Sequence, residues 1–296
     1  MPASSANLGP GFDSLAVALA IYLRVYIYLD DDAEPQRDQL DLLGGADLIA
    51  LGMRRVAEEF GRPLPPRRIR AESQIPVARG LGSSAAAIVA GLQAGAVLLS
   101  DSVMGNDDLI AIGGAIEGHA DNVSAAVLGG VTAAIGTARG YRAVCLATDL
   151  PWKPVLFVPE SAAFTHHARG VLPPNVPLGD ASANIGRAAM LVHAFQNADA
   201  TLLGDAMEDR LHQPYRAELF PHLQPIIRES RNAGAAGACL SGAGPAVLAL
   251  VPEGCVEAVR QAIANTARDL EIAGDVRTPE IDRKGATVCF EGVHLD

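Results

Sequence analysis

The chain has 296 residues, of which 49% are hydrophobic, and a formal net charge of −11 at pH 7. This acidic balance argues against a nucleic-acid backbone as partner, because there is no basic excess to neutralise phosphates. No apolar run approaches the roughly 20 residues needed to cross a membrane, and no basic leader precedes an apolar stretch, so we expect a soluble protein that is not secreted.

The first half of the chain has the pattern of a mixed sheet with helices packed on it. Residues 1–5 are loop-like, so we expect no strand there, whereas residues 21–29 alternate apolar and polar side chains with the period of two typical of a half-buried strand. The other expected elements are a helix capped by Asp47 and ending before residues 61–63, a short strand around Ile69, and helices at 85–99 and 106–116. Residues 126–135 contain a Gly-Gly pair followed by strand-like residues.

The second half has a different order of elements. The patterns predict a strand at 155–158, helices near 184–195, 202–211 and 223–233, strands at 237–240 and 246–250, a helix at 256–270 and a last strand at 286–290. This order of strand, helices, two strands, helix and strand is ferredoxin-like. Pro151 and Pro154 bracket the only tryptophan and mark a boundary. The sequence therefore predicts an α+β fold with two domains, residues 1–150 and 151–296.

The cysteines and the cationic residues indicate the redox environment of the protein and the kind of anion it can bind. The four cysteines stand apart in apolar surroundings, without the spacing of a zinc site or a disulfide framework; they are Cys145, Cys239, Cys255 and Cys289. We therefore expect reduced cysteines in a cytoplasmic protein. Lys153 and Lys284 are the only lysines, so nearly every cation is an arginine, whose planar fork suits carboxylates and phosphates.

One segment has the composition of a phosphate-binding loop: Pro76-Val77-Ala78-Arg79-Gly80-Leu81-Gly82-Ser83-Ser84-Ala85-Ala86-Ala87. Its small residues let backbone N–H groups approach an anion, and the positive end of the following helix points to the same place. Ser83 and Ser84 add hydroxyls that can reach phosphate or a magnesium ion. The alternative is a turn that only caps a buried alanine-rich helix. The segment has neither the lysine of a Walker loop nor the third glycine of a dinucleotide fingerprint.

Three other turns are also small, glycine-rich and polar. They are Ser4-Ser5-Ala6-Asn7-Leu8-Gly9-Pro10-Gly11-Phe12-Asp13, Glu117-Gly118-His119-Ala120-Asp121-Asn122 and Leu240-Ser241-Gly242-Ala243-Gly244-Pro245. Each by itself is explained by a tight turn. Four such turns in one chain favour a ligand site, because glycine lets a backbone approach a ligand or another loop closely.

These four segments resemble the motifs of the GHMP kinase superfamily and, within it, the homoserine kinase branch. The segment at 4–13 is similar to the first motif, 76–87 to the central ATP loop and 239–245 to the third motif, while 117–122 is the segment that distinguishes this branch. The resemblance covers nearly the whole chain. It implies an N-terminal ATP-binding domain of mixed α/β, ribosomal-protein-S5-like type at 1–150 and a C-terminal ferredoxin-like domain at 151–296.

The resemblance also implies an activity, which is ATP-dependent phosphorylation of the hydroxyl of L-homoserine for threonine biosynthesis. It implies that Mg²⁺ is held by Ser84 and Glu117, and it leads us to expect a homodimer. The residues it implies for ATP are Pro76, Val77, Ala78, Arg79, Gly80, Leu81, Gly82, Ser83, Ser84, Ala85 and Ala86. Those it implies for the acceptor are Asn7, Asp13, His119, Asn122, Arg169, Arg216 and Gly242.

The chemistry of these residue types agrees with an amino-acid acceptor. Asp13 suits an ammonium group, and Arg169 and Arg216 suit a carboxylate, although each arginine could also be a solvated surface residue. The resemblance implies that Asn122 and His119 lie at the reacting groups, and the position of Asn122 is similar to that of the mevalonate-kinase base. An amide cannot accept a proton at neutral pH, so we expect in-line transfer by positioning. The alternatives are another GHMP small-molecule kinase or an inactive nucleotide-binding regulatory protein.

Overall fold

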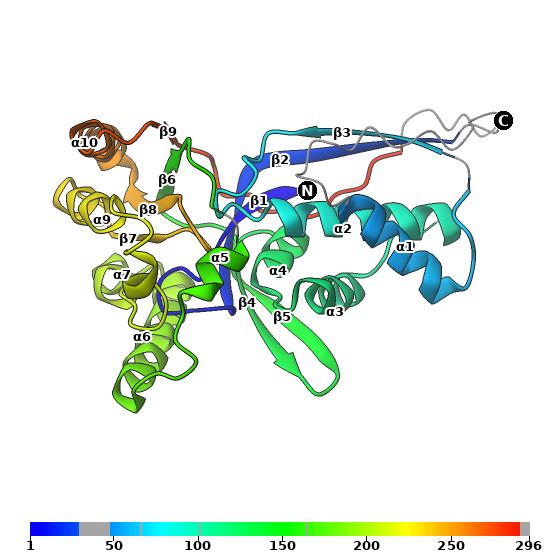
Figure 1. The fold of residues 1–296 in the computed structure, drawn as a ribbon, viewed down its shortest axis with the longest axis horizontal. Coiled ribbons are helices and arrows are strands. Elements are labelled where there is room, and N and C mark those ends of the chain that lie inside the picture. Colours follow the sequence, from blue (N-terminus) through cyan, green and yellow to red (C-terminus); the bar gives the residue numbers. More distant parts are fainter. Residues whose placement is uncertain (30–47, 66, 101, 164, 291–296) are drawn as a thin grey trace.

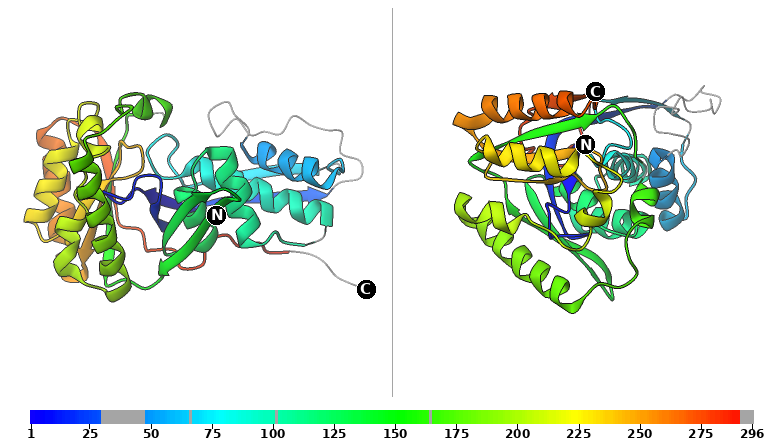
Figure 2. Two further views of the ribbon diagram at one scale, coloured as in Figure 1. Left: turned by 90° about the horizontal axis from the view of Figure 1, so that it is seen from below. Right: turned by 60° about the vertical axis from the view of Figure 1, so that its left-hand side comes forward.

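The structure is a computed structural model that describes residues 1–29, 48–65, 67–100, 102–163 and 165–290. The described strands form two antiparallel sheets, one mainly from each half of the chain (Figure 1). In Figure 2, the helices of the second half, coloured green to orange, form one end of the elongated molecule, and the helices of the first half form the other.

The first sheet is organised around one long strand, β2 (Leu15–Leu29). Its beginning pairs with β1 (Pro2–Ala6) and β4 (Val131–Thr137), and its end pairs with β3 (Arg67–Ser73), while β5 (Gly140–Ala147) completes the sheet beside β4. The expectation of a loop at residues 1–5 was wrong. β1 is buried along its whole length because its small residues pair with β2, with Ser4 opposite Ala18.

The helices of the first half are α1 (Leu48–Phe60), α2 (Ser83–Ser100), α3 (Asn106–Glu117) and α4 (Asp121–Leu128). The central one, α2, is buried on nearly all sides, and its glycines permit close packing: a Cβ on Gly91 would lie 2.1 Å from the Ile49 carbonyl oxygen of α1. By length and composition α2 could cross a membrane, contrary to the expectation that no run is long enough, but 72% of it is buried inside the protein. The expected cap of α1, Asp47, lies outside the described residues.

The second sheet has the order β7-β8-β6-β9, from β6 (Trp152–Pro159), β7 (Gly237–Leu240), β8 (Val247–Pro252) and β9 (Gly274–Arg277). Its helices are α5 (Thr165–Gly170), α6 (Leu178–Asn197), α7 (Ala200–Ala206), α8 (Gln213–Arg216), α9 (Leu223–Asn232) and α10 (Val256–Asp269), with a 3₁₀ turn at Glu253–Cys255. Apolar residues of α9 and α10 share one core cluster with those of the sheet, so both helices cover the same face.

The end of the described chain returns to the first sheet. The prediction of a strand at 286–290 was therefore wrong. The Ala20 N–H donates to the Glu280 carbonyl (2.8 Å), and the Asp282 N–H donates to the Ala18 carbonyl (3.1 Å). The Asp282 carboxylate accepts hydrogen bonds from the Tyr22 hydroxyl and from the Lys284 N–H. Residues 280–286 therefore fasten the second half of the chain to β2, across the boundary expected near residue 150.

Candidate active site

The glycine-serine loop connects β3 to α2, and the helix begins at Ser83, two residues earlier than expected. Gly80 and Gly82 have φ of +74° and +68°, in the left-handed region that favours glycine. A Cβ on Gly80 would lie 2.1 Å from the Ser241 carbonyl oxygen, and a Cβ on Gly82 would lie 2.1 Å from Ser4 Oγ. Both glycines are required because neighbouring segments pack directly on the loop.

The loop is held by the first and third glycine-rich motifs. The Ser4 N–H donates to the Leu81 carbonyl (3.1 Å), and Ser241 Oγ donates to the Gly80 carbonyl (2.7 Å). The Arg79 guanidinium, which we expected near ATP, donates to the carbonyls of Val77 (2.8 Å), Pro159 (2.8 Å) and Glu160. It therefore fastens the loop to the end of β6. The N–H-rich end of α2 lies within this frame, where it can bind an anion.

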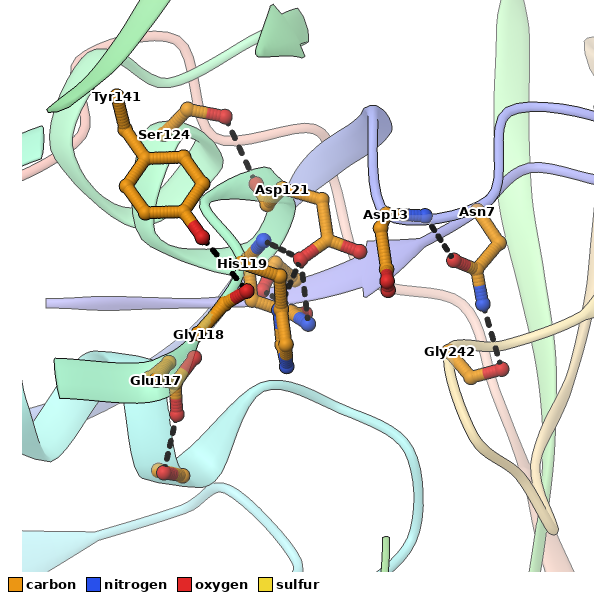
Figure 3. Close-up of polar contacts among 12 residues, drawn as sticks. Asn7, Asp13, Glu117, Gly118, His119, Asp121, Ser124, Tyr141 and Gly242 are labelled. Carbon is orange, nitrogen blue, oxygen red and sulfur yellow. Dashed lines mark hydrogen bonds and ion pairs between the residues drawn. The ribbon is translucent and has the colours of Figure 1, made fainter. Parts of the chain in front are cut away.

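Two oxygen-bearing side chains meet at the start of α2. Ser84 Oγ donates a hydrogen bond to Glu117 Oε1, and Glu117 is the last residue of α3. Figure 3 shows the Glu117 carboxylate pointing away from His119, toward the helix below it. Burial raises the pKa of Glu117, although the Ser84 hydrogen bond acts to lower it. A buried carboxylate is costly to keep charged unless a cation lies beside it. The Ser84 hydroxyl and the Glu117 carboxylate together offer the oxygen donors that Mg²⁺ prefers.

The segment between α3 and the first turn of α4 presents a histidine held by a buried aspartate (Figure 3). His119 Nδ1 lies 2.7 Å from Asp121 Oδ1, which also accepts the Asn122 N–H at 2.8 Å. Burial acts to lower the pKa of His119, but the bond to Asp121 and the charges of Asp121 and Glu117 outweigh it and raise that pKa. Asn122 Oδ1 accepts a hydrogen bond from Ser4 Oγ (2.8 Å), so this amide lies directly against Gly82 of the loop.

An ion pair crosses the site from the first motif to α5. Arg169 Nη2 lies 2.6 Å from Asp13 Oδ1, and Nη1 lies 3.1 Å from Oδ2, so the pair is bidentate. Asp13 also lies close to Asp121 and His119, with one possible ligand atom from each within 4.8 Å of the others. In Figure 3, Asp13 lies on the side of His119 and Asp121 that is opposite Glu117. Negative charge is therefore concentrated here, partly balanced by Arg169.

A second arginine lies deeper. Arg216 in α8 is 1% exposed and donates to the carbonyls of Ala168 (3.0 Å) and Gly242 (3.2 Å), and to His212 Nδ1 (3.2 Å). Burial lowers its pKa to about 10, with a contribution from the charge of Arg169. Asn7 Nδ2 donates to the same Gly242 carbonyl (2.9 Å). Among the described residues, Arg216 has no carboxylate ion-pair partner, although buried charges are usually paired.

The residues expected for the acceptor thus form two sets of contacts: Asn7, Asp13, Arg169, Arg216 and Gly242 form one, and His119 and Asn122, joined by Asp121, form the other. The second set reaches the glycine-serine loop through Ser4, and Asp13 brings the first set close to His119 and Asp121. Sequence reasoning missed four residues of this network, namely Ser4, Phe12, Asp121 and His212. Ser4, Phe12 and Asp121 stand inside the glycine-rich motifs, so the motifs could have identified them as site residues. The only sequence signal for His212 is its place four residues before Arg216, a spacing that puts two side chains on one helical face.

The two family models that match this chain describe the halves of a single class of kinase. "GHMP kinases N terminal domain" matches residues 47–130, and "GHMP kinases C terminal" matches residues 191–269. Together with the two-sheet architecture and the loop at the start of α2, they define a GHMP kinase, so the expected fold class is confirmed. Solved mevalonate kinases, such as that of L. major (TM-score 0.71, 14% identity, 96% of this chain and 95% of that one), share the fold.

More similar relatives narrow the class. A homoserine kinase of Desulfitobacterium hafniense is 36% identical over 97% of this chain and 98% of its own, and one of Crocosphaera subtropica is 35% identical over 97% and 96%. A solved homoserine kinase from Cytophaga hutchinsonii has a TM-score of 0.83 at 27% identity, covering 96% of this chain and 94% of that one. The chain belongs to the homoserine kinase family.

Proposed function

We propose that the protein transfers the γ-phosphoryl group of ATP to the side-chain hydroxyl of L-homoserine, giving O-phospho-L-homoserine and ADP in threonine biosynthesis. One observation carries this proposal: the glycine-serine loop, suited to a triphosphate, lies against a separate cluster of carboxylates and guanidinium groups, suited to an amino acid. The names of the full-length relatives support it.

The Asp13–Arg169 ion pair explains why a zwitterion suits this site. An acceptor ammonium can replace Arg169 beside Asp13, and its carboxylate can replace Asp13 beside Arg169, so neither charge is left unpaired. Asp121 adds negative charge on the ammonium side. Arg216, which has a buried charge and no carboxylate partner among the described residues, supplies a second donor for the acceptor carboxylate.

Transfer itself depends on positioning. Backbone N–H groups at 80–84 and the positive end of α2 hold the triphosphate and stabilise charge on the transferred group. Asn122, fixed by Ser4 beside Gly82, orients the acceptor hydroxyl in line with the γ-phosphate. Its amide takes up no proton, so the hydroxyl proton leaves through a phosphate oxygen or water.

We infer that Mg²⁺ is held by Ser84 and Glu117, where it would neutralise charge on the phosphates. Glu117→Gln keeps the shape and removes the charge, so we expect it to raise the Mg²⁺ concentration needed for half-maximal activity by roughly tenfold or more. The control is Glu58→Gln, a change at an exposed glutamate of α1. An unchanged Mg²⁺ requirement in Glu117→Gln would exclude Glu117 as a ligand.

The test of the activity is ADP release measured with L-homoserine, mevalonate, galactose or no acceptor, with identification of the product by mass spectrometry. Stimulation by homoserine alone supports the proposal. Stimulation by another acceptor instead would identify a different GHMP small-molecule kinase. Tight ATP binding with no turnover on any acceptor would identify a regulatory nucleotide-binding protein.

Two further proposals concern the state of the protein in the cell. The homodimer rests on the resemblance to the family, and light scattering of the purified protein tests it. The cytoplasmic location is supported by the four cysteines, each of which is a free thiol in the structure. Fractionation of the source cells tests the location.

A further inference from the structure

Phe12 lies at the centre of the cations of the acceptor site. The centroid of its ring is 5.4 Å from Arg169 Cζ and 5.6 Å from Arg216 Cζ, and 5.5 Å from the centroid of the His212 ring. Both guanidinium groups are within the distance of about 6 Å at which the negative face of an aromatic ring attracts a cation. One side chain therefore contacts both arginines that we propose for the acceptor carboxylate.

The two guanidinium groups beside the Phe12 ring repel each other. Their other contacts offset this repulsion to different extents in Arg169 and Arg216. Arg169 is neutralised by Asp13, but Arg216 is surrounded by two backbone carbonyls and the His212 imidazole. Entry of a zwitterion would take Asp13 away from Arg169, because the ammonium group needs it. The ring of Phe12 still contacts both guanidinium groups at that moment, and the charge of Asp121 still attracts both.

The backbone fixes this ring firmly. Phe12 stands in a tight turn in which the Gly11 N–H donates to the Asn7 carbonyl (2.9 Å), and the Asp13 N–H donates to Asn7 Oδ1 (3.1 Å). Asn7, Leu8 and Asp13 have φ of +70°, +47° and +54°, a conformation that non-glycine residues adopt at a cost. Strain of this kind persists where the surroundings determine the position of a side chain.

The same side chain also lines an apolar groove of about 380 Å³ between the first motif and α6, together with Leu15, Ile185 and Val192. The ring thus separates an apolar groove from a pair of cations. Any apolar side chain of similar size would fill the groove. Only an aromatic side chain offers a negative face to the arginines.

We propose that Phe12 is a positioning residue that holds Arg169 and Arg216 side by side, so that both bind the single carboxylate of the acceptor. This inference rests on the proposed function and adds a specificity role to a residue that does not touch the reacting atoms. The proposal explains why Phe12 stands next to Asp13 in the first motif. One backbone turn places both the Asp13 carboxylate, for the acceptor ammonium, and the Phe12 ring, which arranges the two arginines.

The test is Phe12→Leu, which fills the groove and removes the aromatic face. We expect the KM for L-homoserine to rise about tenfold, with the KM for ATP unchanged and kcat within about threefold of the wild type. With 3-aminopropan-1-ol, an acceptor that lacks the carboxylate, the variant and the wild type should have equal kcat/KM. Phe12→Tyr and Phe12→Trp keep the aromatic face and should retain the wild-type KM for homoserine.

The control for packing is Val192→Ala, which opens the same groove at α6 without changing the ring, and it should leave the KM for homoserine unchanged. If Phe12→Leu does not fold, as judged by thermal unfolding and ATP binding, Phe12→Met replaces it. An unchanged KM for homoserine in Phe12→Leu, or an equal loss with 3-aminopropan-1-ol, would overturn the positioning role. Failure of the wild type to phosphorylate homoserine would refute the proposed function instead, so the two failures are distinguishable.

Discussion

At the scale of single residues, Gly82 is where three parts of the site leave no room for a side chain. We predict that Gly82→Ala lowers both stability and kcat, because its Cβ would lie 2.1 Å from Ser4 Oγ and 2.9 Å from Asn122 Oδ1. The left-handed backbone costs about 1 kcal/mol and the overpacking about 1–3 kcal/mol more. Urea unfolding and steady-state kinetics measure the two effects.

The chain offers a matched control for this change at Gly61, after the end of α1. Gly61 also has a positive φ (+60°), but no atom lies within 4 Å of the position of its Cβ. Gly61→Ala should therefore show the backbone cost of about 1 kcal/mol alone, with kcat unchanged. If Gly82→Ala and Gly61→Ala lost the same stability and kcat, the close approach of Ser4 and Asn122 to Gly82 would have no effect on either quantity.

The residue types of the site could be predicted from the sequence, but the pairings between them could not. The motifs supplied Asn7, Asp13 and Asn122 as expected site residues, and the resemblance to the family supplied both arginines, which stand outside the motifs. The pairing of Arg169 with Asp13 joins residues 156 positions apart, and no local pattern encodes such a contact. The roles of individual site residues remain predictions until variants are measured.

At the scale of elements, the glycine-serine loop depends on the strand β6, which follows it by some 80 positions in the chain. We predict that Arg79→Met raises the KM for ATP several-fold, with a smaller effect on the KM for homoserine, because the loop loses its hydrogen bonds to the Pro159 and Glu160 carbonyls. The measurement is initial rates at varied ATP concentration.

The control for this variant is Arg70→Met on β3, which removes an exposed arginine paired with Glu72. An exposed ion pair contributes little, so both KM values should stay at the wild-type level. If Arg79→Met raised the KM for homoserine as much as that for ATP, the effect of Arg79 would not be specific to the loop.

Elements with strong periodicity were predicted well, and those stabilised by distant partners were not. The alternation at 21–29 and the helical pattern before residue 60 correspond to β2 and α1. β1 has no apolar alternation, and its strand form comes from pairing with β2. The helix α4 is only 8 residues long and begins at Asp121, within a segment interpreted as a turn. The strand expected at 286–290 fails because β9 takes the place beside β6.

At the scale of the whole molecule, the proposed acceptor site lies where the two halves of the chain meet. The Gly242 N–H donates to the Ala6 carbonyl (3.0 Å), and Asn184 Nδ2 donates to the Pro10 carbonyl (3.4 Å). These bonds join the first motif to the third motif and to α6. No spacing within either half could have predicted them. The same hydrogen bonds therefore join the two halves and position the segments of the proposed acceptor site.

His212 makes this junction sensitive to pH. Its ring is buried and neutral, since Nε2–H donates to the Gly9 carbonyl (2.7 Å) while Nδ1 accepts from Arg216. Burial lowers the pKa of His212 below 6.5, although the charge of Asp209 acts to raise it. Below the unfolded pKa of about 6.5, the unfolded chain binds a proton that the folded chain refuses, so stability is lost as pH falls through that value. The lowered pKa of His222 acts in the same direction, and the raised pKa of His119 acts in the opposite one.

We predict that the Tm of the wild type falls between about pH 7.5 and 5.5 and that His212→Gln reduces this fall, because glutamine keeps an N–H for the Gly9 carbonyl but does not titrate in this range. One buried neutral histidine contributes up to about 1.4 kcal/mol per pH unit below its unfolded pKa. The measurement is thermal unfolding at constant ionic strength. His193→Gln on α6, where the histidine is exposed, controls for the loss of a histidine as such. A His212→Gln variant with the same slope of Tm against pH as the wild type would show that the junction does not depend on a neutral imidazole.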